Sequence, residues 1–180
     1  TEAERLAWRM ADTAPWDLVV CNPAMVLGPV FNARHCRASP MIVRDVLRRT
    51  YPANPRFCYG IHDARDDAAA HHAAFRIPDA RGRHVLSADS RWLRDIAALL
   101  AQQFPAHRIR TGTLPDFILR CAALFDKRMD GNVLDDILGR EPRYDGRHAT
   151  QALGLSYRDV DETIRETAQS MVEQGFAPVR

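Results

Sequence analysis

The segment at residues 22–29, Asn-Pro-Ala-Met-Val-Leu-Gly-Pro, is the part of this sequence best suited to bind a ligand. It follows a short apolar run at residues 16–21, which is typical of a strand buried in a parallel sheet. Ligands of open parallel sheets bind just beyond the carboxyl ends of the strands, where this segment is expected to lie. Pro23 fixes the backbone as it leaves the strand, and the amides and carbonyls of residues 24–26 remain able to meet a planar ligand. An ordinary turn out of the sheet explains these residues equally well.

Three other groups of reactive side chains carry weaker signals. Asp67 and His71 are four residues apart and share a helix face, but no third metal ligand is predictable. Cys36 directly follows a histidine, and adjacent side chains rarely face one another well enough for a thiol and a base to cooperate. The acidic residues at 135–136 and 159–162 are expected at helix beginnings, where carboxylates favour the helix dipole. We therefore predict neither a metal site nor a catalytic residue from these groups.

The spacing of apolar residues predicts the strands and helices that position these side chains: short apolar runs indicate strands, and helical spacing of apolar residues indicates helices. Strands are predicted at residues 16–21, 57–61 and 83–87. Helices are predicted at residues 2–14, 63–75, 116–125, 145–153 and 159–174, with two more that begin at Pro40 and at Asp89 or Ser90. Strands that alternate with helices indicate a parallel α/β sheet, but three strands are fewer than the about 5–6 of a typical sheet. These residues are therefore expected to be part of a larger sheet.

Composition and charge exclude some classes of function. The chain has 180 residues, of which 46% are hydrophobic and 27% charged, as in a globular protein. Its net charge of +2 is too small to indicate a nucleic-acid surface. No apolar run approaches the ~20 residues that span a bilayer, so no membrane partner is expected. The four cysteines are scattered, which predicts reduced thiols and a cytoplasmic location.

A series of short motifs occurs in a fixed order along nearly the whole chain. They are TEAE at 1–4, AW at 7–8, WDLVV at 16–20, NP at 22–23, GP at 28–29, DARDDA at 63–68, A at 80 with GR at 82–83, LGLSYR at 153–158 and ETIRET at 162–167. This ordered set resembles the extended short-chain dehydrogenase/reductase superfamily and, within it, the NAD-dependent epimerase/dehydratase family. The branch it resembles most contains the dihydroflavonol, cinnamoyl-CoA and aldehyde reductases.

The resemblance implies an α/β fold that comprises the C-terminal part of a Rossmann-like parallel sheet and a small, mostly helical substrate-binding subdomain. Residues 1–180 would form the downstream half of one reductase domain. Residues 1–100 would hold the Rossmann-like elements with the substrate loop, and residues 101–180 the mostly helical substrate side.

The residues with which the family performs its chemistry do not occur in this sequence. It has no Gly-rich dinucleotide-binding turn and no Tyr-x-x-x-Lys arrangement, and its single lysine is Lys127. The resemblance places the family's lysine directly before Thr1. The N-terminal dinucleotide-binding half and all catalytic residues are therefore expected upstream.

The resemblance also implies NADP or NAD as the cofactor and a small carbonyl compound as the substrate. The residues that match the family's loop at the nicotinamide end of the cofactor are Pro23, Ala24, Met25 and Val26. The stretch at 31–39, which begins at Phe31 and ends at Ser39, matches the lining of the substrate pocket, and residues 116–128 match it more loosely.

Two acidic residues match positions with a structural role in the family. Asp66, like Asp63, matches such a position, and we expect Asp66 to hold loop amides or to cap the following helix. His62, Asp67 and Asp159 depart from the family pattern, which leaves the subfamily open.

Three functions remain open. The first is reduction of an aldehyde, ketone or acyl-CoA carbonyl by hydride transfer from NAD(P)H. The second is epimerisation or dehydration of a nucleotide sugar in the same superfamily. The third is a non-catalytic, degenerate binding module. The 180 residues taken by themselves favour it, because they contain no complete catalytic set. The family also implies a possible homodimer through the helix at residues 2–14.

Overall fold

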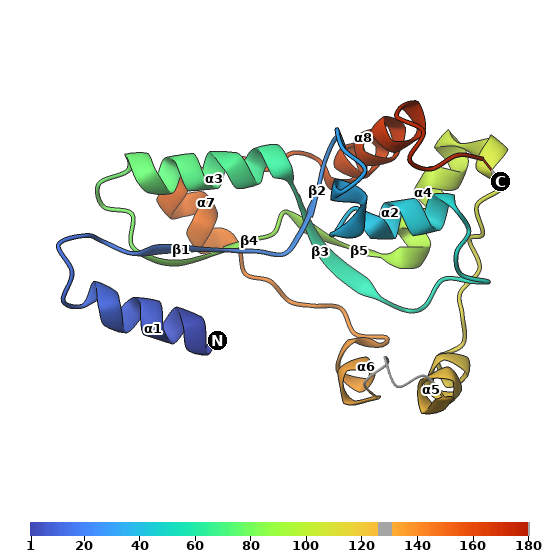
Figure 1. Ribbon diagram of the computed structural model, residues 1–180, viewed down its shortest axis with the longest axis horizontal. Coiled ribbons are helices and arrows are strands. Elements are labelled where there is room, and N and C mark those ends of the chain that lie inside the picture. Colours follow the sequence, from blue (N-terminus) through green and yellow to red (C-terminus); the bar gives the residue numbers. More distant parts are fainter. Residues whose placement is uncertain (126–130, 180) are drawn as a thin grey trace.

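The computed structural model describes residues 1–125 and 131–179 and has an α/β architecture, as the sequence predicts (Figure 1). The strands are β1 (Val19–Pro23), β2 (Met25–Leu27), β3 (Cys58–Asp63), β4 (Gly82–Leu86) and β5 (Asp89–Trp92). The helices are α1 (Glu2–Ala11), α2 (Met41–Leu47), α3 (Ala64–Arg76), α4 (Leu93–Gln103), α5 (Asp116–Phe125), α6 (Gly131–Ile137), α7 (Arg147–Leu153) and α8 (Val160–Glu173). Short 3-10 turns lie at His35–Arg37 and Pro105–His107.

The five strands form two small sheets joined by backbone hydrogen bonds. β1 pairs with β4 in parallel, and β2 pairs in parallel with β3, whose other edge pairs with the antiparallel β5. Ala24, between β1 and β2, donates its amide to the Leu86 carbonyl at 2.9 Å. Ala88, between β4 and β5, donates its amide to the Ile61 carbonyl at 2.9 Å. Parallel pairing is therefore confirmed, and the antiparallel edge strand is an addition to it.

Three predictions about local structure were wrong. Residues 25–27 form β2 rather than a loop, because the edge of β3 offers them a parallel partner. Residues 89–92 form β5, so neither Asp89 nor Ser90 caps α4, which begins after Trp92. The acidic pair at 135–136 lies near the end of α6 rather than at its beginning. Asp135 there forms an ion pair of 2.7 Å with Arg120 of α5, and this partner was not visible in the sequence.

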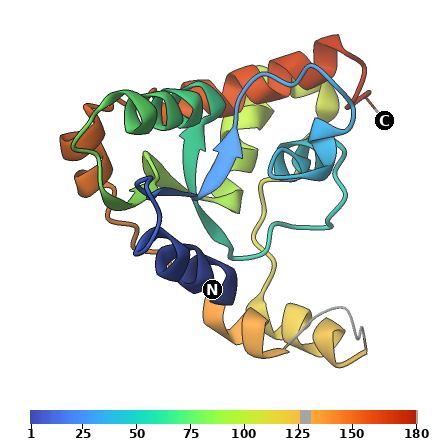
Figure 2. The same cartoon turned by 60° about the vertical axis from the view of Figure 1, so that its left-hand side comes forward.

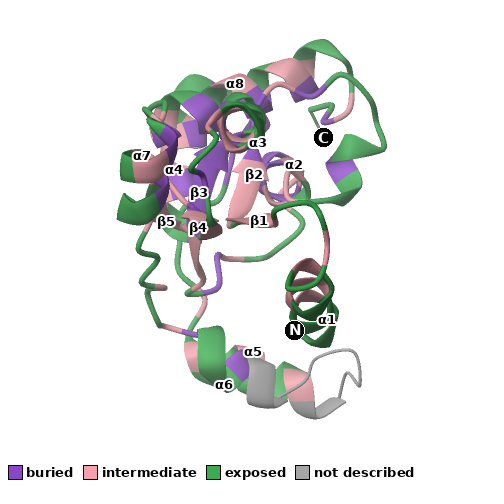
Figure 3. Cartoon of the chain, turned by 90° about the vertical axis from the view of Figure 1, so that its left-hand side faces the viewer, coloured by how far each residue is buried: buried purple, intermediate pink, exposed green. Residues whose placement is uncertain are grey.

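The main hydrophobic core lies between the β2-β3-β5 sheet and three helices, α2, α4 and α8 (Figure 3). The residues predicted to face inward from α8 are all buried, and they are Val160, Ile164, Thr167, Ala168 and Met171. A smaller core packs α3 against β1 and α7 against β4. Gly154 ends α7 in the left-handed conformation, as predicted.

Helix α1 stands apart from both cores (Figures 2 and 3). It ends at Ala11, three residues earlier than predicted, and none of its residues is buried. The side chains of its apolar face remain open to solvent, with Leu6 50% and Met10 56% exposed. Arg83 of β4 bonds to Glu4 at 2.7 Å and ties the helix to the sheet.

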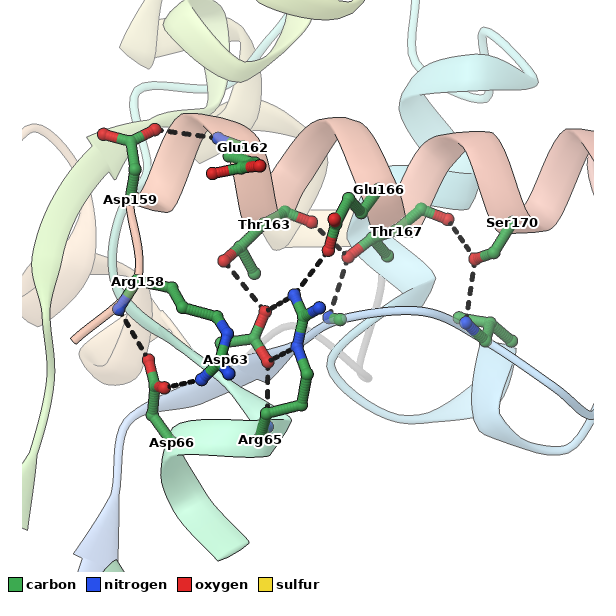
Figure 4. A network of polar contacts seen from close by, with 12 residues as sticks. Asp63, Arg65, Asp66, Arg158, Asp159, Glu162, Thr163, Glu166, Thr167 and Ser170 are labelled. Atoms are coloured by element: carbon green, nitrogen blue, oxygen red, sulfur yellow. Dashed lines mark hydrogen bonds and ion pairs between the residues drawn. The ribbon is translucent and has the colours of Figure 1, made fainter. Parts of the chain in front are cut away.

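Hydroxyl groups of α8 bind the backbone that leaves β2 (Figure 4). The Gly28 amide donates to Thr167 Oγ1 at 2.8 Å, and the Val30 amide donates to Ser170 Oγ at 2.8 Å. Each hydroxyl in turn donates to a carbonyl of its own helix. Gly28 has a φ of 144°, a conformation that side chains other than hydrogen rarely allow. The turn at Gly28 is thus fixed by its own geometry and by α8.

Asp63 joins the end of β3, the beginning of α3 and the face of α8 (Figure 4). Its carboxylate is 1% exposed and accepts from the Arg65 amide at 2.8 Å, the Arg65 guanidinium at 2.7 Å and the Thr163 hydroxyl at 3.0 Å. Burial alone raises the pKa of Asp63, but the hydrogen bonds from Arg65 and Thr163 outweigh burial and lower this pKa below its ordinary value.

Of the two roles expected for Asp66, holding loop amides and capping the following helix, the first is confirmed. Asp66 accepts the backbone amide of Arg158 at 2.8 Å and also contacts the Arg158 guanidinium, so it holds the loop before α8. The cap of α3 is Asp63 instead. Asp159 caps α8 by accepting the Glu162 amide at 2.8 Å, which agrees with the predicted helix beginning.

The contact between Thr167 and Gly28 predicts a measurable loss of stability. We expect Thr167→Val to lower the free energy of unfolding by about 1–3 kcal/mol, because the buried Gly28 amide loses its acceptor. Urea denaturation followed by circular dichroism measures this change. The exposed Gln169→Ala on the same helix is the matched control and should change stability by less than about 0.5 kcal/mol. Equal effects of the two substitutions would contradict the role of Thr167.

The lowered pKa of Asp63 predicts a dependence of stability on pH. Because the folded pKa lies below the unfolded value of about 3.9, the carboxylate stabilises the fold above pH about 4. This contribution is lost as the pH falls through the lower folded pKa. We therefore expect the stability difference between wild type and Asp63→Asn to be largest near pH 7 and to shrink toward pH 2. Urea denaturation at a series of pH values measures this difference, and a difference that stays constant from pH 7 to pH 2 would contradict the role of the Asp63 carboxylate.

Candidate functional site

A cavity of ≈ 550 Å³ opens at the carboxyl end of β1, where β1 passes into β2. We call it the junction cavity. It is lined by Pro23, Ala24, Met25, Ser39, Phe57, Cys58, Tyr59, Gly60, Asp136, Ile137, Arg140, Glu141, Pro142 and Tyr144. Ligands of open α/β sheets bind beyond the carboxyl ends of the strands, and this cavity lies beyond the carboxyl end of β1. Its volume is also within the range of small-molecule sites.

The structure brings four of the six predicted binding residues together at this cavity. Pro23, Ala24 and Met25 line it from the strand junction, and Ser39 lines it from the turn before α2. Val26, which follows Met25 in β2, is not among the residues that line it. Their binding roles remain predictions.

Phe31 also lies outside the cavity. It comes after the turn at residues 28–29, and its side chain is 77% exposed. The more loosely matched stretch at 116–128 forms α5 up to Phe125, and its last three residues, including Lys127, lie outside the described residues.

One detail of the predicted backbone site was wrong. The sequence suggested that the amides of residues 24–26 are free to meet a ligand. The Ala24 amide instead donates to the Leu86 carbonyl at 2.9 Å, because β4 lies beside the strand junction. Pro23 has no amide hydrogen. Pro23 and Ala24 can therefore offer a ligand apolar surface but no free N–H.

Tyr144 forms a wall of the cavity that sequence reasoning missed. Its ring lies so close to Gly60 of β3 that a Cβ atom at Gly60 would stand 2.4 Å from two ring carbons. A glycine inside a strand is the signal that could have indicated such an approach. The ring separates the junction cavity from a second cavity of ≈ 520 Å³ at the end of β4, which includes Ser87, Arg147 and Tyr157 in its lining.

The second cavity has a polar rim fixed by an ion pair. Asp145 accepts two hydrogen bonds from the Arg147 guanidinium, at 2.9 and 2.7 Å, and these bonds lower the pKa of Asp145 to about 2. Gly146 between them approaches the backbone of β4 closely, since a Cβ atom there would lie 3.0 Å from the Ser87 carbonyl oxygen. The segment that carries Tyr144 is thus held against the strand ends.

The ionisable groups nearest to the strand in the junction cavity remain neutral. Burial is the main cause that raises the pKa of Cys58, to about 11, and the Glu141 carboxylate raises it further. Burial also raises the pKa of Tyr59 well above its ordinary value. A nucleophilic thiol or an acidic phenol requires the opposite shift. These two side chains therefore shape the cavity without supplying a nucleophile or a proton donor.

The side chains considered above as a metal site or as a thiol–base pair have other partners in the structure. Asp67 lies 3.2 Å from Nε2 of the buried His62, and its other oxygen is 4.0 Å from His71. Among the residues that the structure describes, no three His, Cys, Asp or Glu side chains are arranged to hold a metal ion. Cys36 is buried, and burial raises the pKa of its thiol, while the histidine before it is exposed. Within the described ranges, we find no helix with the length and apolar character needed to span a membrane.

The raised pKa of Cys58 predicts slow alkylation. Roughly one Cys58 thiol in a thousand is ionised at pH 8, so iodoacetamide should modify it far more slowly than the exposed Cys121. The Cys58 rate should keep rising by about tenfold per pH unit between pH 8 and 10. Peptide mass spectrometry after timed labelling measures both rates. Equal labelling of the two thiols at pH 8 would contradict the raised pKa.

Comparisons with known proteins agree with this fold. No family model matches the chain. Cinnamoyl-CoA reductase 1 of Petunia hybrida is 25% identical over 177 residues, which cover 98% of this chain and 47% of the petunia protein.

Solved structures show the same arrangement of elements. The yeast methylglyoxal/isovaleraldehyde reductase complexed with NADPH has a TM-score of 0.68 and 24% identity, over 97% of this chain and 50% of that one. A nucleoside-diphosphate-sugar epimerase from Pseudomonas aeruginosa has a TM-score of 0.72 and 16% identity, over 95% of this chain and 55% of that one.

The chain is homologous to members of the extended short-chain dehydrogenase/reductase superfamily of the NAD(P)-dependent epimerase/dehydratase type. This confirms the family that the ordered motifs resemble. The chain spans about half the length of the curated relatives it matches, which agrees with the expected C-terminal portion.

Proposed function

We propose that this chain is the substrate-side half of an NAD(P)-dependent oxidoreductase that reduces a carbonyl group by hydride transfer. The observation that supports this most directly is the junction cavity at the ends of parallel strands. Pro23, Ala24 and Met25 line it, and these residues match the family's loop at the nicotinamide end of the cofactor. A relative from Saccharomyces cerevisiae is named as an NADPH-dependent methylglyoxal reductase, and the petunia relative as a cinnamoyl-CoA reductase.

The residues of this chain suit a positioning role in that reaction. When bound, NAD(P)H supplies the hydride. Pro23 and Met25 offer an apolar surface against which a nicotinamide ring can pack, and Ser39 lines the same cavity. Tyr144 closes one side and separates this space from the polar second cavity. These walls hold the substrate and limit the access of water to it.

The proton donor of the proposed reaction must come from outside these walls. A catalytic tyrosine needs a neighbouring ammonium group that lowers its pKa toward neutrality. Tyr59 shows the opposite, because burial raises its pKa. We therefore assign the family's Ser, Tyr and Lys to residues upstream of Thr1, and no catalytic residue to the present chain.

Two uncovered surfaces support the proposal that an upstream dinucleotide-binding half packs against this chain. Among the described strands, β1 has β4 on one edge and no strand on the other. Helix α1, which precedes β1, leaves Leu6 and Met10 largely exposed. A neighbouring strand and its packing layer would cover both surfaces. Within this proposal, residues 1–100 contribute the Rossmann-like elements with the substrate loop, and residues 101–180 the mostly helical substrate side.

We extend the proposal to assembly and location in two respects. A homodimer through α1, which the family resemblance implies, would use the part of this helix that the upstream half leaves exposed. Cys21, Cys36, Cys58 and Cys121 are all free thiols, which supports a cytoplasmic location.

An epimerase or dehydratase acting on nucleotide sugars is the second candidate. The structural likeness to the Pseudomonas aeruginosa epimerase supports it, although likeness at 16% identity concerns the fold. A non-catalytic binding module is the third, because the family's catalytic set does not occur in the 180 residues. The reaction of the protein extended upstream of Thr1 separates these candidates.

The test uses the gene region upstream of Thr1 together with this chain. The extended protein should oxidise NADPH when it is given an aldehyde, and absorbance at 340 nm follows this reaction. The 180-residue chain should bind NADPH weakly or not at all, because it lacks the phosphate-binding turn. Conversion of a nucleotide sugar without net consumption of NADPH would identify the epimerase instead. No reaction of either kind would favour the binding module.

Two variants of the extended protein test the cavity itself. Met25→Ala should lower kcat/KM by roughly tenfold or more, because Met25 lines the junction cavity. Phe31→Ala should change it by less than about twofold, since Phe31 is exposed outside the cavity. The reverse order of effects would contradict the assignment of the site.

A further inference from the structure

Two stretches that are far apart in the sequence line much of the junction cavity. The first is residues 57–60, at the beginning of β3. The second comes from the end of α6 and the segment after it, and we call it the α6 wall; it consists of Asp136, Ile137, Arg140, Glu141 and Pro142. Among the described residues that line the cavity, Arg140 is the one cation. The position of the α6 wall relative to β3 therefore decides which charged groups a ligand meets.

Helices α5 and α6, which lead to the α6 wall, stand away from the main core (Figures 1 and 2). They pack on each other, and Arg120 of α5 forms an ion pair of 2.7 Å with Asp135 of α6. Neither helix contributes a described residue to the core between the β2-β3-β5 sheet and α2, α4 and α8. A segment with few buried contacts opens locally at a low free energy, so the contacts at its two ends control its position.

Arg56, directly before the first of the two stretches, contacts both ends of this pair of helices. Its guanidinium forms an ion pair of 3.0 Å with Asp116, the first residue of α5. Its carbonyl accepts the amide of Gly139, two residues after the end of α6, at 2.8 Å. Gly139 directly precedes Arg140. A single residue thus joins the beginning of β3 to the α6 wall.

The Arg56 guanidinium also lies against the backbone of Gly139. A Cβ atom at Gly139 would stand 3.1 Å from Nη2 and 3.2 Å from Cζ of Arg56. The φ of Gly139 is 69°, a left-handed conformation that residues with a side chain rarely adopt. The planar guanidinium therefore covers a turn that glycine allows. A lysine at position 56 would keep the charge but not this flat contact.

The backbone around Arg56 is fixed to the core. The carbonyl of Phe57 accepts the amide of Leu93, which is 3% exposed, at 2.8 Å. The carbonyl of Asn54, which is 5% exposed, accepts the Leu114 amide at 2.8 Å. Arg56 is thus held on both sides by buried residues. Its contacts with α5 and α6 relate those helices to the core.

We propose that Arg56 is a positioning residue of the junction cavity, which sets the place of the α6 wall and with it the affinity for the substrate. This inference rests on the proposed function, because the substrate is that of the proposed reductase. Arg56 is not among the described residues that line the cavity, so it acts through Asp116 and Gly139. A wall that contacts the substrate equally before and during the reaction changes KM and leaves kcat unchanged.

Hydrogen exchange of the 180-residue chain tests the position of the α6 wall without a substrate. The side chains of Arg56 and Asp116 are 49% and 31% exposed, and a pair as exposed as this adds little to overall stability. Arg56→Ala should therefore keep the fold. It should speed exchange in peptides that cover α5 and residues 134–142 by about threefold or more, while α4 and α8 keep their rates.

Two further variants sharpen this measurement. Arg56→Lys should restore slow exchange in α5, where the charge meets Asp116, but not at residues 134–142, where the flat contact is lost. The matched control is Arg94→Ala, because Arg94 forms its ion pair of 3.3 Å with Asp95 inside α4. It should change exchange in neither segment. Unchanged exchange in Arg56→Ala, or equal acceleration in α4 and α8, would overturn the inference.

Kinetics of the protein extended upstream of Thr1 test the consequence for the substrate. Arg56→Ala should raise the KM for an aldehyde by about fivefold or more and change kcat by less than about twofold. The KM for NADPH should stay within about twofold, since Pro23 and Met25 are not part of the α6 wall. Arg94→Ala should change none of these constants by more than about twofold. Equal effects of the two substitutions would overturn the inference.

The wild-type reaction separates failure of this inference from failure of the proposed function. Reduction of the aldehyde by the extended wild type, with an unchanged KM in Arg56→Ala, would overturn the inference and leave the reductase function standing. Oxidation of NADPH with no aldehyde would overturn the reductase function and, with it, the effect on substrate affinity assigned to Arg56.

Discussion

The buried carboxylate of Asp63 is the interaction on which the rest of the structure depends. It ends β3, caps α3 and accepts the Thr163 hydroxyl of α8, so one side chain joins a strand and two helices. The cost of removing this charge from water is offset by the Arg65 guanidinium and by several hydrogen bonds. Thr167, one turn further along α8, holds the Gly28 amide where the chain leaves β2. The carboxyl ends of β2 and β3 are therefore positioned from α8.

This scaffold produces a site built for binding more than for proton transfer. Cys58 and Tyr59 face the junction cavity, and burial keeps both protonated. Tyr144, which approaches Gly60 closely, lines both the junction cavity and the second cavity. A ligand would thus be held by shape and by apolar contact, and charged groups would remain at the rim. Such walls are compatible with the proposed role of this chain, in which other residues supply the acid and the cofactor-binding turn.

Local signals in the sequence were sufficient where the controlling contacts are local. The buried face of α8 follows from the spacing of Val160, Ile164 and Met171, and its beginning follows from the side chain of Asp159. Errors arose where a distant partner decides the structure. β2 exists because β3 offers it an edge, and residues 89–92 pair with β3 in place of starting a helix. Asp135 of α6 forms an ion pair with Arg120 of α5. Its position was predicted from the dipole of its own helix, and that prediction could not take account of a partner on another helix.

The sequence by itself determined the family, the α/β class and the stretch of chain that borders the site. Motif order and apolar periodicity can be read along the chain. They do not depend on which residues far apart in the sequence pair with one another. Only the tertiary structure decided which atoms are available at the site. The Ala24 amide is engaged because Leu86 lies beside it, and Met25 faces the cavity while Val26 does not. Asn54 likewise bonds to the Gly112 carbonyl, fifty-eight residues away, shortly before α5 begins. Cavity walls come from segments far apart in the chain, so their composition cannot be read from any one of them.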